Sequence, residues 1–325
     1  MKKLVLATFL GLGVFVVTSL NAEKLSSEQF SQVANDCFKI RNKTTCQRLI
    51  DSGLVSVEQC DKSNCNNIGV VYGLVGDYHQ SAKYYAKACE LNDKWGCSLI
   101  ATSYKDGQGV RQNLFEALKY FQKSCDLNLS MGCFNLGVLY AEGKGAKQDF
   151  ITARKHYEKA CEAEHADACH NLAILYQNEW GVKRDFAIIK GYFEKACNLN
   201  QAGSCNNLAI LYDDGQGVRQ DFAQALKLYK KACDMNLPNA CYNLGNLYRN
   251  GKGTKQDLNA AKKHYEKACE GNDAFACQNL AVMYYNGHGV KKDLSVSKKY
   301  NGKACDLGNQ AGCDNYRELN ESGVK

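Results

Sequence analysis

The stretch CNNLAILYDDGQGVRQDFAQALKLYKKAC, residues 205–233, recurs along the chain with small changes. Its opening motif returns as CFNLGVLY at Cys133, CHNLAILY at Cys169, CYNLGNLY at Cys241 and CQNLAVMYY at Cys277, a period of 36 residues. Self-similarity at roughly 20–50 residues is typical of solenoids, in which each repeat packs only on its neighbours. The sequence therefore predicts a stack of helical repeats.

The composition agrees with a folded helical chain. Of 325 residues, 45% are hydrophobic and only one is proline, which excludes a disordered protein. The formal net charge is +7, but basic and acidic residues are interspersed and form no block. These charges indicate solvated faces, and no nucleic-acid partner is expected.

The first 22 residues resemble a secretory signal. Lys2 and Lys3 form a basic start, residues 4–17 form an apolar segment too short for a membrane span, and cleavage after Ala22 is expected. No other stretch is long and apolar enough to cross a bilayer. The sequence thus predicts a secreted or periplasmic protein with no membrane span.

Eighteen cysteines in an exported chain predict disulfides. No CxxC motif occurs, so no metal site and no cofactor are expected. Residues eight apart in one helix would lie about 12 Å apart, whereas a disulfide needs Cα atoms within about 7 Å. The chain must therefore turn between paired cysteines. Local pairing is the simplest choice and gives Cys37-Cys46, Cys60-Cys65, Cys89-Cys97, Cys125-Cys133, Cys161-Cys169, Cys197-Cys205, Cys233-Cys241, Cys269-Cys277 and Cys305-Cys313.

Each full repeat divides into two helices, A and B. In helix A an aliphatic residue, a Gly or Ala, and a tyrosine follow the opening cysteine at +3, +4 and +7, which makes one apolar stripe. A glycine then predicts a left-handed helix end. Glu179-Trp180 replaces this glycine in one repeat and predicts a loop of different shape. Helix B should begin after an N-cap residue at Asn113, Asp149, Asp185, Asp221, Asp257 and Asp293.

These residues resemble the Sel1-like repeat, a relative of the tetratricopeptide repeat, and the cysteine pairs resemble the Helicobacter cysteine-rich proteins. The resemblance implies an all-α fold: a right-handed α/α superhelical solenoid of helix pairs with a concave groove, here cross-linked by disulfides. It also implies binding of penicillin-type or peptidoglycan-like compounds, weak β-lactamase activity and contact with host immune factors. The expected divisions are a signal peptide over 1–22, degenerate capping helices over 23–61, a short repeat over 62–93, full repeats over 94–129, 130–165, 166–201, 202–237, 238–273 and 274–309, and a half repeat over 310–325.

One polar column is not explained by the core. An asparagine stands two residues after each helix A cysteine except at Leu99, and lies about 150° from the centre of the apolar stripe. Such amides could hold an extended peptide in the groove, since each donates and accepts hydrogen bonds. The alternative is that each bonds to the next repeat. The candidate groove residues are Asn67, Asn135, Asn171, Asn207, Asn243, Asn279 and Asn315.

An enzymatic function has less support from the residues. Ser-x-x-Lys, the serine β-lactamase motif, occurs at Ser295–Lys298 and Ser322–Lys325, but neither Ser-Asp-Asn nor Lys-Thr-Gly accompanies it. His156 and His264 share a helix B column three repeats apart, and no HxH or HExxH occurs. No catalytic residue is predicted. The expected function is an exported scaffold that binds a peptide or protein partner, and slow β-lactam hydrolysis is the alternative.

Overall fold

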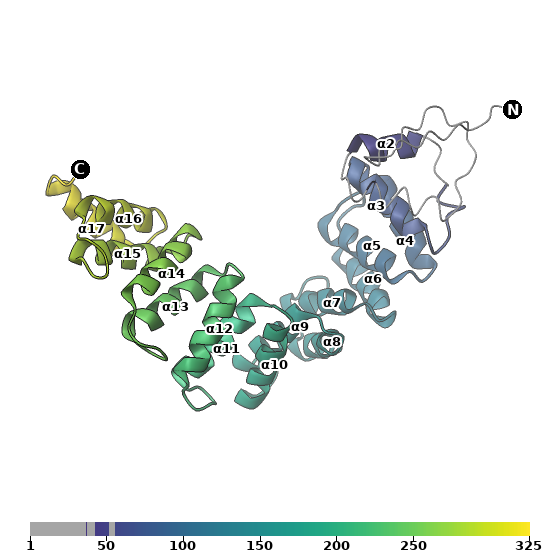
Figure 1. Ribbon diagram of the computed structural model, residues 1–325. Helices are drawn as coiled ribbons and strands as arrows, with labels where there is room; N and C mark the ends of the chain where they lie inside the picture. The colour runs from purple at the N-terminus through teal and green to yellow at the C-terminus, as the bar shows by residue number, and fades with distance from the viewer. Residues whose placement is uncertain (1–36, 38–42, 52–55) are drawn as a thin grey trace, which may run out of the picture. The chain divides into compact units, whose positions relative to one another are not determined.

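The computed structural model describes Cys37 and residues 43–51 and 56–325 (Figure 1). The predicted signal peptide over 1–22 lies outside these residues, as do residues 23–36, 38–42 and 52–55 of the predicted capping helices. The chain divides into two compact units, which are considered separately. Unit 1 runs to Gly132 and includes Lys144–Ala146, and unit 2 comprises Cys133–Gly143 and residues 147–325.

The described residues form α-helices and no strand, which confirms the all-α prediction (Figure 1). After the short helix α2 (Lys43–Asp51), A and B helices alternate, and consecutive helices pack together within each unit. The A helices are α3 (Cys65–Val75), α5 (Lys94–Asp106), α7 (Ser130–Glu142), α9 (Ala166–Gln177), α11 (Ala202–Asp214), α13 (Pro238–Asn250), α15 (Ala274–Asn286) and α17 (Gln310–Glu321). The B helices are α4 (Tyr78–Glu90), α6 (Leu114–Asp126), α8 (Phe150–Glu162), α10 (Phe186–Asn198), α12 (Phe222–Asp234), α14 (Leu258–Glu270) and α16 (Leu294–Asp306). No described helix has the length and apolarity to cross a membrane.

The predicted apolar stripe of helix A is the core. Its +3 and +4 residues are buried along the stack, and the small residue at +4 lets a B-helix aromatic ring approach closely. At Gly245, for example, an added Cβ would lie 2.7 Å from the ring of Tyr265. The +7 tyrosines lie at the core edge, where most stack on a ring of helix B, as Tyr104 does on Tyr120 with centroids 5.6 Å apart. The prediction that these tyrosines pack in the core is confirmed.

The predicted helix ends are also confirmed. Helices α5, α11, α13 and α15 each end at a glycine with φ between 67° and 75°. Asn113 and the five aspartates of its column each accept a backbone N–H of the following B helix. These carboxylates are therefore engaged in capping.

The loop after α9 differs less than its sequence predicts. Helix α9 ends at Gln177, and Glu179 adopts a φ of 59°, the left-handed conformation that glycine adopts in other repeats. Its carboxylate lies 3.0 Å from the guanidinium of Arg184. The prediction of a differently shaped loop was wrong for this backbone position, because the turn geometry is kept by a non-glycine residue.

Disulfides close the turns between each B helix and the next A helix. Six of the expected pairs eight residues apart are bonded, with Cα–Cα distances of 4.4–4.8 Å, as are Cys37–Cys46 and Cys60–Cys65. Cys125 and Cys133 are disulfide-bonded as well. Within each unit the bonded cysteines lie at the junction of consecutive repeats, so each bridge there fixes where one helix pair meets the next.

Each turn between cysteines eight residues apart contains one residue in the left-handed conformation. It is asparagine in most turns, as at Asn200 and Asn236, but Glu164 holds this position with a φ of 59°. A left-handed conformation costs most side chains roughly 1–2 kcal/mol and asparagine less. We therefore expect Glu164→Asn to raise the free energy of unfolding by about 0.5–1 kcal/mol, measured by chemical denaturation. Glu164→Gln should give no gain, and an equal gain from both would contradict this explanation.

Candidate functional site: the polar face of the A helices

The seven candidate asparagines all lie on A helices, and all are half-buried. Asn67 belongs to α3 in unit 1, and the other six belong to unit 2. We call the surface formed by the +2, +5 and +9 residues of the A helices the A face. The +9 residues, such as Asn250 and Asn286, are exposed at its edge.

Several of these amides bond within the stack. The Nδ2 of Asn243 donates to Oδ1 of Asn206 in the preceding repeat at 3.2 Å, and Nδ2 of Asn206 lies 3.4 Å from Oδ1 of Asn207. These bonds support in part the alternative that the asparagines bond to a neighbouring repeat and not to a ligand. However, an asparagine side chain offers two donor hydrogens and an oxygen with two lone pairs, so one bond leaves capacity for a ligand.

Tyrosines of the B helices also form hydrogen bonds with asparagines of the A helices. The hydroxyl of Tyr265 donates to Oδ1 of Asn246 at 2.6 Å, and the Asn279 amide lies 3.5 Å from that oxygen. Tyr157 interacts in the same way with Asn171 of the next repeat. Burial raises the pKa of Tyr157 and of Tyr265 to about 12, so both hydroxyls stay protonated and can donate.

In unit 2 the A face is hollowed between consecutive A helices. A cavity of about 400 Å³ lies between α13 and α15. Asn279 lines it together with the apolar Val282 and Met283, while Arg249 and His288 supply its basic groups. A second cavity of about 210 Å³ follows between α15 and α17, and Asn315 and Glu318 line it. Val282 contributes to both, so the two cavities are adjacent on the A face.

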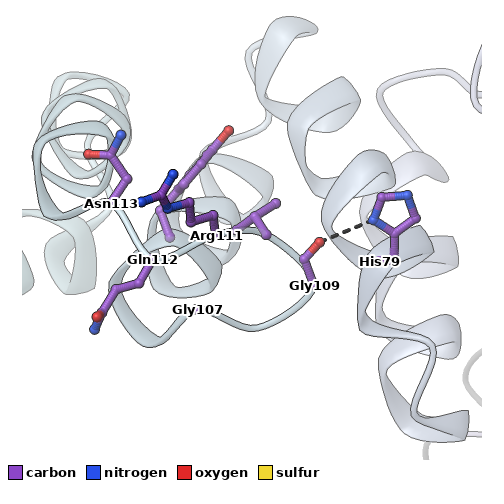
Figure 2. Close-up of a pocket in the computed structure, with 8 residues that line it drawn as sticks. His79, Gly107, Gly109, Arg111, Gln112 and Asn113 are labelled. Carbon is purple, nitrogen blue, oxygen red and sulfur yellow. Dashed lines mark hydrogen bonds between the residues drawn. The ribbon is translucent and has the colours of Figure 1, made fainter.

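A larger open hollow in unit 1 lies beside the loop that follows α5. This hollow has a volume of about 890 Å³. Figure 2 shows His79, Arg111, Gln112 and Asn113 among the residues that line it. Most of its polar groups are already engaged. The Nδ1 atom of His79 lies 3.2 Å from the Gly109 carbonyl oxygen, Gln112 donates to the carbonyl of Lys105, and Asn113 caps α6. This leaves few groups that could define a ligand.

The equivalent loop of unit 2 carries a similar hollow of about 750 Å³. Gln220 again donates to a carbonyl, that of Asp213, and Lys190 lies over the Tyr212 ring, 5.9 Å from its centroid. The glutamine at this position therefore holds the loop through a side-chain hydrogen bond in both repeats. The A face remains the better candidate site, because its amides recur and two of them, Asn279 and Asn315, line cavities that are less open than these loop hollows.

Neither Ser-x-x-Lys match forms a serine–lysine pair. The Ser295 hydroxyl donates to the capping carboxylate of Asp293 at 2.7 Å, whereas Lys298 donates to the carbonyl of Val324. The Ser322 hydroxyl donates to the carbonyl of Leu319 at 2.9 Å. Neither serine is positioned against a lysine that could activate it.

The histidines are individually packed. His156 and His264 stack on Tyr140 and Tyr248, and the described residues contain no group of His, Cys, Asp or Glu suited to hold a metal ion. His165 stacks on Phe134 with centroids 4.5 Å apart. His170 bonds through Nδ1 to the buried hydroxyl of Ser204, at 2.7 Å, and so joins two successive A helices.

These contacts predict a loss of stability in mild acid. Burial lowers the pKa of His165, His170 and His264 in the folded chain. The unfolded chain then binds more protons, so stability is complete above the ordinary histidine pKa of about 6.5 and falls as the pH drops through it. We expect the melting temperature to fall between pH 7.5 and 5.0, and to fall less in His170→Gln. An equal fall in both proteins would contradict this assignment.

Sequence reasoning missed the residues that complete these networks. Asn206 and Asn246 follow no repeat-wide column, so only the fold reveals that they bond to the asparagine column. Three lysines that stand two residues before the last cysteine of helix B were also missed. Lys123, Lys231 and Lys267 donate to the carbonyls of Cys89, Cys197 and Cys233 in the preceding repeat, at 2.6–2.7 Å. The recurrence of this lysine was the available signal.

The Sel1 repeat family matches residues 96–129, 130–165, 166–201, 202–237, 238–273 and 274–309, and the tetratricopeptide repeat matches residues 63–94. The chain belongs to the Sel1 repeat family. Among solved structures, this Sel1 repeat protein is similar to a protective antigen of uropathogenic Escherichia coli strains, at 23% identity and a TM-score of 0.76. That alignment covers 87% of this chain and 60% of the antigen, and it shows the shared fold.

Two Helicobacter pylori proteins are also similar to this Sel1 repeat protein. Cysteine rich protein B is 32% identical, with 40% of this chain and 93% of that protein covered at a TM-score of 0.34. The protein named "Putative beta-lactamase HcpD" is 41% identical over 39 residues, 12% of this chain and 13% of its own length. The family match confirms the predicted Sel1-like repeats, and HcpD shows that a Helicobacter protein contains a similar stretch of sequence.

Proposed function

We propose that this Sel1 repeat protein is an exported scaffold that binds an extended segment of a peptide or protein along the A face, with a host factor as one kind of partner. The observation that carries the proposal is the cavity of about 400 Å³ lined by Asn279. It combines an amide that can pair with a peptide backbone and an apolar floor that can take a side chain. The adjacent cavity beside Asn315 offers a second such position.

The test uses a displayed library of random 12-residue peptides selected on the full chain. We expect Asn243→Ala combined with Asn279→Ala to weaken a selected peptide about tenfold, since each lost hydrogen bond is worth about 0.5–1.5 kcal/mol. Affinity would be measured by isothermal titration calorimetry. The matched control is Asn259→Ala, an exposed asparagine on the B helix α14. Equal affinity of the double variant and the control would exclude the A face.

The disulfides are the reason for proposing that the protein is exported. The described cysteines are all bonded, and disulfides on this scale form and persist in oxidising compartments such as the periplasm or outside the cell. Protein taken directly from cells should therefore react with no thiol reagent until it is reduced. A chain that lacks residues 1–22 should accumulate with free thiols.

Slow β-lactam hydrolysis is the alternative. Its support is the name of HcpD, which matches 12% of this chain. Turnover of the chromogenic β-lactam nitrocefin would establish it, and peptide selection without nitrocefin turnover would favour the scaffold. Because the Ser295 hydroxyl donates to the capping carboxylate of Asp293, Ser295→Ala should leave any such turnover unchanged.

A further inference from the structure

The last repeat differs from every earlier repeat at one inward position of its B helix, and from most of them at a second. Asn301 stands where every earlier repeat carries a tyrosine or phenylalanine, such as Tyr229 and Tyr265. One turn earlier, Ser297 replaces the alanine found at Ala225 and Ala261. Both new residues stay inside: Ser297 is fully buried and Asn301 is 3% exposed. A large ring and a methyl group are thus replaced by two smaller or more polar groups.

The substitution leaves a cavity in unit 2 instead of a filled core. The cavity of about 210 Å³ described above lies between α15, α16 and α17, and Ser297, Asn301, Asn315 and Glu318 are among the residues that line it. Water occupies roughly 30 Å³ per molecule in the liquid, so a small ligand group has room. In earlier repeats the ring at this position interacts with the column asparagine, as Tyr265 does with Asn279. Asn315 has no such ring beside it.

The residues that line the cavity offer acceptors with free capacity, beside the amide donors of Asn286, Asn301 and Asn315. The Oδ1 atom of Asn301 is buried and has no hydrogen-bond partner among the described residues, and a buried acceptor without a partner destabilises the fold. The Ser297 hydroxyl donates its hydrogen to the carbonyl of Ala281 at 2.8 Å, so towards the cavity it can only accept. Glu318 lies exposed at the rim and adds a negative charge.

We propose that this cavity binds the protonated amine or guanidinium at the end of an alkyl chain. These groups donate several hydrogen bonds, accept none and carry the charge that complements Glu318. Tyr285, which also lines the cavity, already attracts the ammonium of Lys292, 5.6 Å from its ring centroid. The inference deepens the proposed function, because it assigns a lysine or arginine side chain of the bound segment to this end of the A face.

The test uses small probes, so it does not depend on peptide binding. The full chain is titrated with n-butylammonium and n-butylguanidinium, and the side-chain amide signals of Asn301 and Asn315 are followed by NMR. We expect saturable shifts with a dissociation constant of about 1–10 mM, in the range of small fragments. Butyrate, an anion of similar size, should cause none. The probe that binds more tightly distinguishes a lysine-type from an arginine-type ligand.

Two variants decide whether the cavity is responsible. Asn301→Tyr restores the residue of the other repeats and should abolish binding while the chain stays folded. Asn301→Leu removes the acceptor without a ring and should weaken binding at least tenfold. Unchanged affinity in both variants, or no shift in the parent protein up to about 50 mM probe, would overturn the proposal and leave a cavity filled by water only. Loss of peptide binding with intact probe binding would overturn the proposed function alone.

Discussion

Reduction of the disulfides is expected to unfold this solenoid near room temperature. Each regular bridge closes a loop of eight residues, which stabilises the chain by about 2.5 kcal/mol in the chain-entropy description. Over the seven regular bridges, with Cys125 and Cys133 included, this amounts to about 18 kcal/mol, more than the roughly 5–15 kcal/mol by which most domains are stable. Because each repeat contacts only its neighbours, no distant contact compensates for a lost bridge.

Circular dichroism at 222 nm with and without a phosphine reductant would measure this effect. The oxidised chain should melt cooperatively, and the reduced chain should lose most of its helical signal at 25 °C. A single open bridge, in Cys233→Ala combined with Cys241→Ala, should cost about 2.5 kcal/mol of unfolding free energy. A reduced chain that melts within a few degrees of the oxidised one would show that the helices are stable without their bridges.

Loss of the Lys267 ammonium is expected to destabilise the stack of B helices in unit 2. This ammonium donates to the Cys233 carbonyl at 2.6 Å, near the C-terminal end of α12. The last carbonyls of a helix lack partners in their own helix and attract positive charge. Lys267→Met keeps the alkyl chain but removes this charged hydrogen bond. We expect it to lower the free energy of unfolding by about 1.5 kcal/mol.

An equivalent lysine in another repeat provides a matched control for Lys267→Met. Lys195 occupies the same column and is also half-buried, but it makes no corresponding hydrogen bond in the described chain. Lys195→Met should change the free energy of unfolding by less than about 0.5 kcal/mol. Equal losses from Lys195→Met and Lys267→Met, measured by urea denaturation, would mean that packing of the alkyl chain and not the hydrogen bond is responsible.

The features that recur with the 36-residue period could be predicted from the sequence. The caps at Asp221 and Asp257 and the glycine ends at Gly215 and Gly251 depend on local backbone chemistry. Local chemistry is the same in every repeat. A residue type that recurs at one position of each repeat therefore indicates the same cap or helix end in each. Glu179 shows the limit of this reasoning, because the turn keeps its left-handed residue after the glycine is lost.

Features made by residues outside the recurring columns could not be predicted. The bond of His170 to Ser204 and that of Asn243 to Asn206 each join residues more than 30 positions apart, and the sequence gives no sign of either. The cavity beside Asn301 was also missed. Its cause, the loss of an aromatic residue from one column, is visible in the sequence, but the volume it leaves depends on how α17 packs there.

The most direct test of binding at the A face is an NMR map of the asparagine side-chain amides in the full chain with a selected 12-residue peptide. The proposal predicts shifts at Asn243, Asn279 and Asn315 and none at Asn259 on the B helix. Shifts at Asn259, or at the loop residue Asn113, without change at the three A-face asparagines would contradict it.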